Sequence, residues 1–438
     1  NIKTTSAEAP GCMHVDVSGN TSCRFYQDYY FAQNFADLGF TVGVFGKHLN
    51  VDNPEGPPPG VDRWMVNGGG NYLNPTFSWA SRGVTPSSVT FDNCTGGSGC
   101  YSTSVIGNAS VAWIRDHVAS STLSPKPFFA YVSVKAPHIQ DGPGWPVAIP
   151  APWHVNAPVP HSQAPRTPNY NMSCPDHHWL VRQQPPLTPT QASKADDLFV
   201  SRLRALLAVD DLVDEIVEAL EELAVLNNTF IVFTSDHGYR FGQYRMPQGK
   251  WAPYENDVRV PFYVRGPGVR AGSHPSSIIG STVDVMPTLL NLVNGQAGGA
   301  QSPVIPESMD GVSFAADLLQ QEDEQRRQRP QRTTLLIEYV GLGDVVRYEH
   351  LEDTANNTFR ALRVIDPTAD KGSRNFKFIE FTDSITDWNF NSVLEMELFD
   401  LDSDPFEMVN LAHTVSEAVI KRLHMAAEEL YRCAGKTC

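Results

Sequence analysis

Short apolar runs alternate with longer amphipathic stretches over most of the chain. The apolar runs are rich in β-branched and aromatic residues and are followed by glycine or polar residues, as is typical of buried strands. The predicted strands cover residues 40–45, 128–134, 230–233 and 262–264. Helical spacing of apolar residues predicts helices over 31–39, 102–117 and 192–226. Strands that alternate with helices predict an α/β fold with a mainly parallel sheet flanked by helices.

The pattern changes in the last quarter of the chain. Residues 278–293 read as a strand or turn that leads into a helix, and residues 320–332 are charged and glutamine-rich, as in a solvated linker. Strands are then predicted at 334–339, 376–381 and 394–398, followed by a final helix from about 415 to 431. We therefore expect a large domain over residues 1–332 and a smaller antiparallel-sheet-and-helix domain over 333–438.

Composition narrows the range of partners. The 438 residues carry a formal net charge of −16, and 41% of them are hydrophobic, which fits a globular chain. An acidic chain of this kind is not expected to bind nucleic acid or a membrane surface in general. No apolar stretch is long enough to predict a membrane span. The sequence does not predict an oligomeric state.

Cysteines and glycosylation motifs point to the secretory route. Short spacings favour the disulfides Cys94–Cys100 and Cys433–Cys438 in an oxidising compartment. Cys12, Cys23 and Cys174 remain as an odd set. The six N-x-S/T motifs begin at Asn20, Asn93, Asn108, Asn171, Asn227 and Asn356. We expect a glycoprotein of the secretory pathway, either lysosomal or extracellular.

Charged side chains follow three predicted strands at their carboxyl ends. Lys47 ends one strand, His138 follows another, and Asp236 and His237 follow a third, with Lys250 in the loop after them. Ligands of α/β sheets bind outside the carboxyl ends of the strands. Lysines next to a metal-binding acid and a histidine could hold a sulfate or phosphate ester and protonate its leaving oxygen.

The order of residues after the third strand is specific. Asp236-His237-Gly238 is followed by Gly249-Lys250, Tyr254-Glu255, Arg259 and Pro261, and this order resembles the sulfatase family of the alkaline-phosphatase-like superfamily. Within that family the chain is most similar to the N-acetylglucosamine-6-sulfatases and the extracellular sulfatases. Further matching segments are G-K-H-L-N at 46–50, A-P-H at 136–138, H-W-L-V-R-Q at 178–183, D-L-D-S-D-P-x-E-x-x-N-L-A at 400–412 and C-A-G-K-T-C at 433–438.

The resemblance implies roles for the strand-end residues. Asp236 and His237 match positions that bind Ca²⁺, and Lys47, His138 and Lys250 match positions that contact the sulfate or the leaving oxygen. The most similar sulfatases carry Asn where His237 stands, whereas other sulfatases carry His. Many sulfatases have a histidine two residues after the lysine that matches Lys47, but here His48 follows directly, so no catalytic role is assigned to it.

The nucleophile of the family does not occur in this sequence. Sulfatases convert the cysteine of a C-x-P-x-R motif to formylglycine and complete the Ca²⁺ site with a pair of aspartates. None of the seven cysteines has this context, so the sequence contains no nucleophile. We expect both features in an upstream segment, and we expect the chain as given to bind Ca²⁺ weakly and to lack turnover. The alternative is a non-catalytic descendant.

The expected function is hydrolysis of sulfuric esters. The substrate class would be sulfated sugars, including glycosaminoglycans, or aryl sulfates, as in N-acetylglucosamine-6-sulfatases and arylsulfatases. A phosphodiesterase or phosphonate hydrolase of the same superfamily is one alternative, and a non-catalytic glycan-binding protein is another.

Overall fold

A computed structural model describes most of the chain. The described residues are 31–48, 56–94, 100–120, 126–140, 145–273, 280–296, 309–319, 332–341, 357–365, 375–382 and 390–435, with 305–307 and the short strands named below. The chain divides into two compact units, one of residues 1–162 and 197–229 and the other of 163–196 and 230–438. The domain boundary expected after residue 332 stays a prediction.

The first unit contains a five-stranded mixed sheet in the order β6-β5-β4-β3-β7. Strand β3 runs parallel to β4 and β7, whereas β4–β5 and β5–β6 are antiparallel pairs. The interior of β3 is buried along nearly its whole length, as is typical of a strand covered on both faces. The strands are β3 (Thr41–Lys47), β4 (Arg63–Asn67), β5 (Thr76–Ser81), β6 (Ser87–Thr90) and β7 (Phe128–Ser133). A separate two-stranded pair is formed by β1 (His14–Val15) and β2 (Thr21–Ser22).

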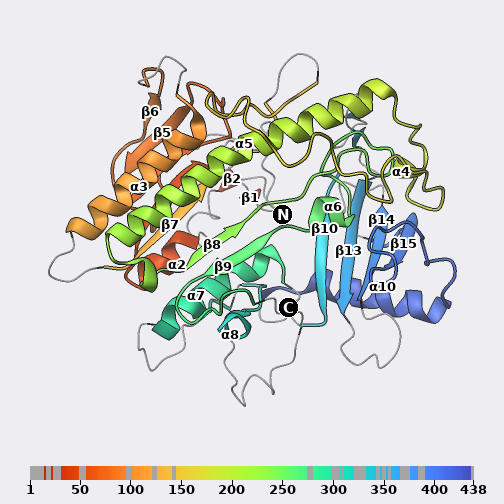
Figure 1. Ribbon diagram of the computed structural model, residues 1–438. Coiled ribbons are helices and arrows are strands. Elements are labelled where there is room, and N and C mark those ends of the chain that lie inside the picture. Colours follow the sequence, from red (N-terminus) through yellow and green to blue (C-terminus); the bar gives the residue numbers. More distant parts are fainter. Residues whose placement is uncertain are drawn as a thin grey trace. The chain divides into compact units, whose positions relative to one another are not determined.

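Helices pack on this sheet through aromatic side chains. Phe35 of α2 (Phe31–Asp37) stacks on Phe129 of β7 with ring centroids 4.0 Å apart, and Trp113 of α3 (Ser102–Ser120) lies 5.6 Å from the ring of Phe45. Helix α5 (Pro189–Glu222), which belongs to the first unit from residue 197 on, runs alongside α3 (Figure 1). It ends before the turn η1 (Leu226–Asn228).

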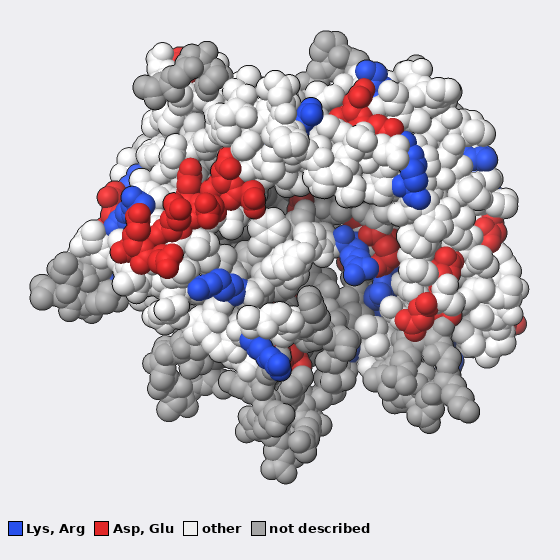
Figure 2. Space-filling view, viewed as in Figure 1, with Lys and Arg blue, Asp and Glu red and all other residues white. Residues whose placement is uncertain are grey.

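The exposed face of α5 is strongly acidic. Figure 2 shows acidic side chains gathered along this helix, and a polyanionic ligand would be repelled there. The exposed acids of this stretch are Asp210, Asp211, Asp214, Glu215, Glu218, Glu221 and Glu222.

The second unit is built on a four-stranded antiparallel sheet in the order β10-β13-β14-β15. The strands are β10 (Thr334–Tyr339), β13 (Thr358–Ile365), β14 (Asn375–Thr382) and β15 (Glu395–Asp400), and the final helix is α10 (Glu417–Arg432). The other elements of this unit are α4 (Trp179–Arg182), β8 (Ile231–Thr234), α6 (Glu255–Val258), β9 (Phe262–Arg265), η2 (Thr282–Asp284), α7 (Val285–Gln296), α8 (Ala315–Leu318), β11 (Val346–Arg347) and β12 (Glu352–Asp353). Strands β8 and β9 pair antiparallel.

One face of the four-stranded sheet packs against α10. Leu362, Phe378 and Leu398 are direct neighbours across three strands, and they form one apolar cluster with residues of the helix. Arg360 lies on the same face, fully buried, and pairs with Glu380 of β14 at 2.7 Å and Glu428 of α10 at 2.5 Å. Two carboxylates neutralise this buried cation, so it can be part of the core, although its Nη2 has no hydrogen-bond partner among the described residues.

A buried ionic network lies on the opposite face of the sheet. The Lys377 ammonium of β14 contacts Glu255 at 2.6 Å and Glu407 at 2.7 Å, and it donates to the Pro253 carbonyl at 3.0 Å. Arg363 of β13 also pairs with Glu255, at 2.7 Å. Burial would raise the pKa of Glu255, but Lys377 and Arg363 hold it below its ordinary value. The segment before β9 is therefore fixed to the sheet by charge.

The predicted elements are largely confirmed. The helices expected at 31–39, 102–117 and 192–226 correspond to α2, α3 and α5, and the expected strands correspond to β3, β7, β8, β9, β10, β14 and β15. The expected α/β core and the separate antiparallel C-terminal sheet with its helix are both present, but the described sheet of the first unit is mixed rather than mainly parallel, because β4, β5 and β6 are joined as antiparallel neighbours. Strands β4, β5, β6 and β13 and the two-residue strands β1, β2, β11 and β12 were not predicted. The linker over 320–332 lies outside the described residues except for Arg332.

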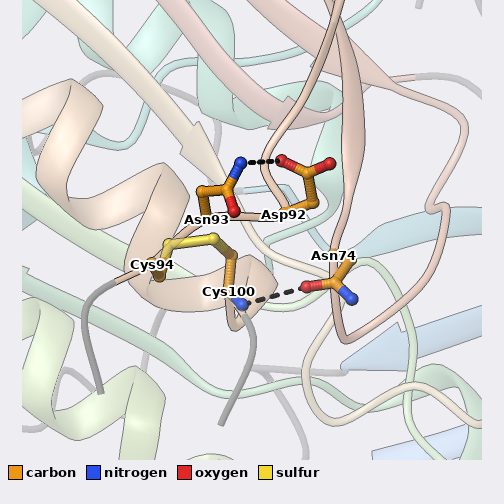
Figure 3. The surroundings of a disulfide bond; sticks show 5 residues. All are labelled: Asn74, Asp92, Asn93, Cys94 and Cys100. Atoms are coloured by element: carbon orange, nitrogen blue, oxygen red, sulfur yellow. Dashed lines mark hydrogen bonds between the residues drawn. A yellow bond between two sulfur atoms is a disulfide. The ribbon is translucent and has the colours of Figure 1, made fainter. Parts of the chain in front are cut away.

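The disulfide Cys94–Cys100 is confirmed. Its Cα atoms are 5.1 Å apart, and it closes a loop beside Asn74, whose side chain accepts a hydrogen bond from the Cys100 amide at 3.2 Å (Figure 3). Cys433 is disulfide-bonded, but Cys438 lies outside the described residues, so that pairing stays a prediction. Cys174 is a buried thiol whose pKa burial raises to about 12. Cys12 and Cys23 lie outside the described residues.

The glycosylation motifs differ in exposure. Asn93, Asn108 and Asn227 are exposed, whereas Asn171 is half-buried and accepts a hydrogen bond from the Leu187 amide at 2.8 Å. Asn20 and Asn356 lie outside the described residues. Glycosylation at all six positions stays a prediction.

Replacing Lys377 with Met should destabilise the second unit strongly. The variant leaves Glu407 buried without its cation, and breaking a buried pair in this way costs about 3–5 kcal/mol. Lys421→Met, at an exposed position of α10, is the matched control and should change stability by about 0.5 kcal/mol or less. Urea denaturation measures both variants, and equal stabilities would contradict a stabilising role for the network.

Stability should fall with rising pH because of Glu397. This fully buried carboxyl has its pKa raised by burial to about 7, so the folded protein holds a proton that the unfolded chain releases above its ordinary pKa. This proton stabilises the folded state fully only below the ordinary pKa of a glutamate. The stabilisation is lost as pH rises from there through 7, by about 3 kcal/mol at most. Glu397→Gln should remove this pH dependence in denaturation curves at pH 5 and pH 8. An unchanged dependence would show that Glu397 does not titrate in this range.

Candidate functional site

Lys47 lies at the carboxyl end of β3 in the first unit. Its backbone pairs with Asn67 of β4, and Gly46 before it pairs with Ser133 of β7. The half-exposed Lys47 side chain passes close to Gly69, where an added Cβ would lie 3.6 Å from Lys47 Cε. The parallel register therefore brings the carboxyl ends of three strands together at Lys47.

The loop after β4 is held in place by buried polar groups. The Asn67 side chain accepts a hydrogen bond from the Gly69 amide at 3.0 Å and donates to the Thr76 carbonyl at 3.1 Å. Lys135, which follows β7, donates to the Gly70 carbonyl and to Gln140 Oε1 at 3.1 Å. The loop beside Lys47 is thus fixed from both neighbouring strands. The sequence analysis did not identify Asn67 or Lys135.

His138 lies in the segment after β7 and follows a cis peptide bond between Ala136 and Pro137. The Tyr72 hydroxyl donates to the His138 carbonyl at 2.6 Å, and His138 Nδ1 lies 2.7 Å from the Ile139 carbonyl. A carbonyl only accepts, so Nδ1 carries the proton of this contact. A protonated His138 would therefore carry its second, transferable proton on Nε2.

His48 is packed as a structural residue. Its ring lies edge-on to Trp64 with centroids 4.9 Å apart, and its amide donates to the Asn67 carbonyl at 3.2 Å. Burial lowers the pKa of His48 to about 4, so the ring is neutral at physiological pH. This agrees with leaving His48 out of the catalytic set.

In the second unit, β8 ends immediately before Ser235, Asp236 and His237. The Asp236 carboxylate is exposed, and one of its oxygens accepts a hydrogen bond from the His237 amide at 3.0 Å. Its other oxygen lies 3.4 Å from His237 Nε2. The acid and the imidazole predicted as metal ligands thus direct donor atoms to the same place.

Lys250 joins this pair from the loop before β9. Its ammonium lies 2.8 Å from His237 Nε2, while His237 Nδ1 lies 2.8 Å from the Gly238 carbonyl. A carbonyl accepts and an ammonium donates, so the ring proton is on Nδ1 and the Nε2 lone pair accepts. The structure therefore confirms that Asp236, His237 and Lys250 lie together, although their catalytic roles stay predictions.

A Ca²⁺ ion would find only part of a coordination shell here. Asp236 supplies a carboxylate, the kind of donor that Ca²⁺ prefers, whereas the single lone pair of His237, on Nε2, accepts from the Lys250 ammonium in this structure. Within the described part of the chain, no group of three or more His, Cys, Asp or Glu residues could hold a metal ion. Asp236 therefore fits a metal site that needs more ligands, and His237 would join that site once the Lys250 ammonium leaves Nε2.

The Tyr254-Glu255 pair of the motif has a structural role. The Tyr254 hydroxyl donates to Glu397 of β15 at 3.1 Å, and Glu255 is held by Lys377 and Arg363 of the sheet. The Glu255 amide also donates to Glu407 at 2.7 Å. These contacts fix the loop that carries Lys250.

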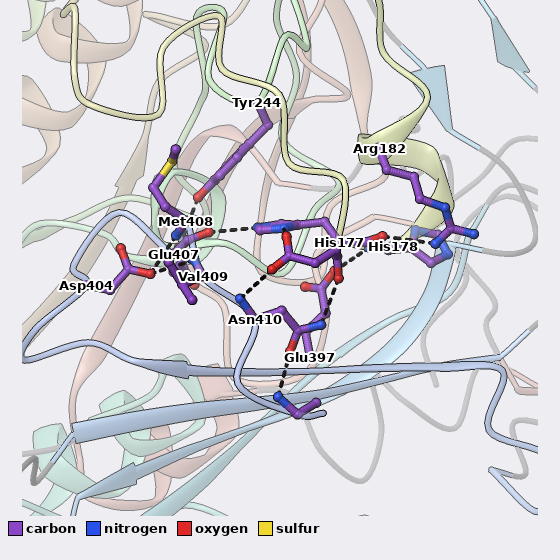
Figure 4. A network of polar contacts seen from close by, with 12 residues as sticks. His177, His178, Arg182, Tyr244, Glu397, Asp404, Glu407, Met408, Val409 and Asn410 are labelled. Atoms are coloured by element: carbon purple, nitrogen blue, oxygen red, sulfur yellow. Dashed lines mark hydrogen bonds and ion pairs between the residues drawn. The ribbon is translucent and has the colours of Figure 1, made fainter. Parts of the chain in front are cut away.

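Two other segments that carried the family resemblance meet in one polar network (Figure 4). His177 Nε2 donates to the Glu407 carbonyl at 2.7 Å, and the His178 amide donates to Glu397 at 2.5 Å. Asn410 donates from its side chain to the Asp176 carbonyl at 2.8 Å. Residues 176–178 are therefore held by β15 and by the segment after it, at Glu407 and Asn410.

The sequence matches known sulfatases over most of its length. The family model described as "Sulfatase" matches residues 14–295. An arylsulfatase of Volvox carteri is 31% identical over 93% of this chain and 61% of its own length. The human N-acetylglucosamine-6-sulfatase is 29% identical over 76% of this chain and 58% of its own length. The chain thus spans about three fifths of the length of these relatives.

Solved structures share the fold. The structure of BT4656 in complex with its substrate D-glucosamine-2-N,6-O-disulfate has a TM-score of 0.65 at 20% identity and covers 92% of this chain and 82% of its own. The structure of BT1596, a 2-O GAG sulfatase, has a TM-score of 0.54 at 17% identity, with coverage of 98% and 77%. With the family match over residues 14–295 and the arylsulfatase relative at 31% identity, these findings show that the chain belongs to the sulfatase family.

Proposed function

We propose that the full-length protein hydrolyses sulfate esters. The observation that carries the proposal is the grouping of Lys250, His237 and Asp236 at the end of β8, with the Lys250 ammonium 2.8 Å from His237 Nε2. A fixed cation beside a pair of metal-binding donors suits an anionic ester, because both stabilise negative charge as the ester bond breaks. Family membership supports sulfate as the anion.

The residues of the first unit would supply proton transfer and further positive charge. We propose that Lys47 contacts a nonbridging sulfate oxygen and that His138 protonates the leaving oxygen, as the family resemblance implies. The contact between His138 Nδ1 and the Ile139 carbonyl supports this assignment, because it leaves Nε2 for the transferable proton. The polar contacts of Asn67 and Lys135 would keep the loop beside Lys47 in place.

We propose Ca²⁺ as the metal that Asp236 and His237 bind, with His237 released for this role when the Lys250 ammonium leaves its Nε2 for the sulfate. Further ligands would come from other parts of the full-length protein. A bound Ca²⁺ would supply Lewis-acid stabilisation of the sulfate oxygens. The nucleophile of the family, formylglycine, is expected outside this sequence. The chain's own residues would orient the ester and neutralise its charge.

The substrate class that we propose is sulfated sugar, including N-acetylglucosamine 6-sulfate units of glycosaminoglycans, with aryl sulfates as the second class. Relatives named N-acetylglucosamine-6-sulfatase and arylsulfatase support both. We place the protein in the secretory pathway, lysosomal or extracellular, on the basis of the Cys94–Cys100 disulfide. No described helix is both long and apolar enough for a membrane span.

Lys250→Ala should lower kcat for an aryl sulfate by on the order of 10²-fold, because a preorganised charge that strengthens in the transition state is lost. Lys250→Arg should restore little activity, since a planar fork does not replace a compact ammonium. Steady-state kinetics of the full-length protein measure both variants. Lys421→Ala, exposed on α10, is the control and should leave kcat unchanged. A folded Lys250→Ala protein with normal kcat would remove Lys250 from the site.

Asp236→Ala should weaken Ca²⁺ binding in the full-length protein. One carboxylate ligand is lost from a shell that needs about six to eight oxygens, so a calcium titration should show at least a tenfold rise in Kd. Glu218→Ala, at an exposed position of α5, is the control for a general loss of negative charge. Equal affinities of the two variants would contradict the assignment of Asp236 as a ligand.

A further inference from the structure

Arg240 is a buried cation between His237 and Lys250 in the sequence. It is 2% exposed and pairs with the Asp257 carboxylate, which is also 2% exposed. Neither residue contributes to the chemistry proposed above. A buried pair of this kind is costly to desolvate, so its presence in a loop next to the site calls for a physical explanation.

The pair closes the loop from Gly238 to Asp257 on itself. The Gly238 amide donates to the Asp257 carbonyl at 2.7 Å, which fixes the start of the loop to its end. The Arg240 amide donates to the Gly249 carbonyl at 3.0 Å, so Arg240 lies directly opposite the residue that precedes Lys250. The Asp257 carboxylate also accepts from the Ala252 amide at 2.8 Å. These contacts connect the backbone on both sides of Lys250 to a single ion pair.

Two glycines let the loop backbone approach the ion pair closely. A Cβ at Gly249 would lie 2.5 Å from an Arg240 terminal nitrogen, and the φ of Gly249 is +145°. A Cβ at Gly238 would lie 2.1 Å from the Asn256 carbonyl oxygen. Only glycine fits at both positions, because the loop backbone runs directly against the Arg240–Asp257 pair and its neighbours.

We propose that Arg240 and Asp257 are positioning residues that fix the backbone on both sides of Lys250, so that its ammonium stays within reach of the site at the end of β8. The proposal rests on the proposed role of Lys250 in sulfate ester hydrolysis. The planar guanidinium defines the distance between the two sides of the loop, and Asp257 fixes the orientation of the guanidinium. The pair acts through Lys250 and contacts no substrate.

A double-mutant cycle in the full-length protein separates this role from general stabilisation. Arg240→Lys keeps the positive charge that pairs with Asp257 but removes the planar fork. In the parent protein it should lower kcat for an aryl sulfate by on the order of 10-fold to 100-fold with a smaller change in KM, since small misplacements of a catalytic group are costly. In the Lys250→Ala background the same substitution should have little further effect, because the group that it positions is already absent.

Arg360→Lys provides a matched control. Arg360 is likewise buried and paired with Glu380, but it lies on the α10 face of the antiparallel sheet. This variant should lower the melting temperature and leave kcat of the folded protein unchanged. Asp257→Asn, which keeps an acceptor oxygen for the Ala252 amide, is the second variant if Arg240→Lys fails to fold, and it should repeat the result of the cycle.

The outcomes discriminate between the two proposals. Equal fold-losses from Arg240→Lys with and without Lys250, or a folded Arg240→Lys protein with normal kcat, would overturn the positioning role. If Lys250→Ala alone leaves kcat unchanged, that result contradicts the proposed catalytic role of Lys250, independently of the effect of Arg240→Lys on kcat. A loss of kcat confined to the background that contains Lys250 would support the positioning role.

Discussion

The buried ammonium of Lys377 is the contact on which much of the second unit depends. It pairs with the carboxylates of Glu255 and Glu407 and donates a hydrogen bond to the Pro253 carbonyl. Two segments far apart in the sequence are thereby held against one strand of the antiparallel sheet. Ion pairs this deeply buried gain little net stability, but they require one specific arrangement of the chain. Here the arrangement that they specify is the path of the loop between β8 and β9, which carries Lys250.

The loop is thus constrained at two levels. The sheet holds Tyr254 and Glu255 from one side, through Glu397, Lys377 and Arg363. The Arg240–Asp257 pair closes the same loop internally. Catalytic groups must be held to a fraction of an ångström, and a loop of this length does not achieve that without supporting contacts. The antiparallel sheet of this unit therefore serves as a support for the segment that carries Lys250.

Sequence patterns predicted the alternating elements and the strand-end residues because both depend on local order. The D-H-G and G-K-x-x-x-Y-E spacing identified Asp236, His237 and Lys250, which the structure brings together. Strand β13 was missed because Arg360 and Arg363 interrupt its apolar run. Glu380 and Glu428 neutralise the buried Arg360, and Glu255 neutralises the half-buried Arg363. Arg240 and Asp257 gave no signal either, since a buried pair formed across a loop has no characteristic spacing in the sequence.

The central claim is that this sulfatase-family chain contributes to sulfate ester cleavage. Turnover by the full-length protein of a sulfate monoester and of a phosphate diester with the same aryl leaving group tests it most directly. The account predicts hydrolysis of the sulfate ester, with kcat/KM at least about 10²-fold above that for the phosphate diester. The reason is that the proposed lysine contacts and Ca²⁺ site would match the charge and shape of a sulfate monoester better than those of a phosphate diester. Preference for the phosphate diester, or no turnover of either ester by a folded, calcium-loaded protein, would contradict it.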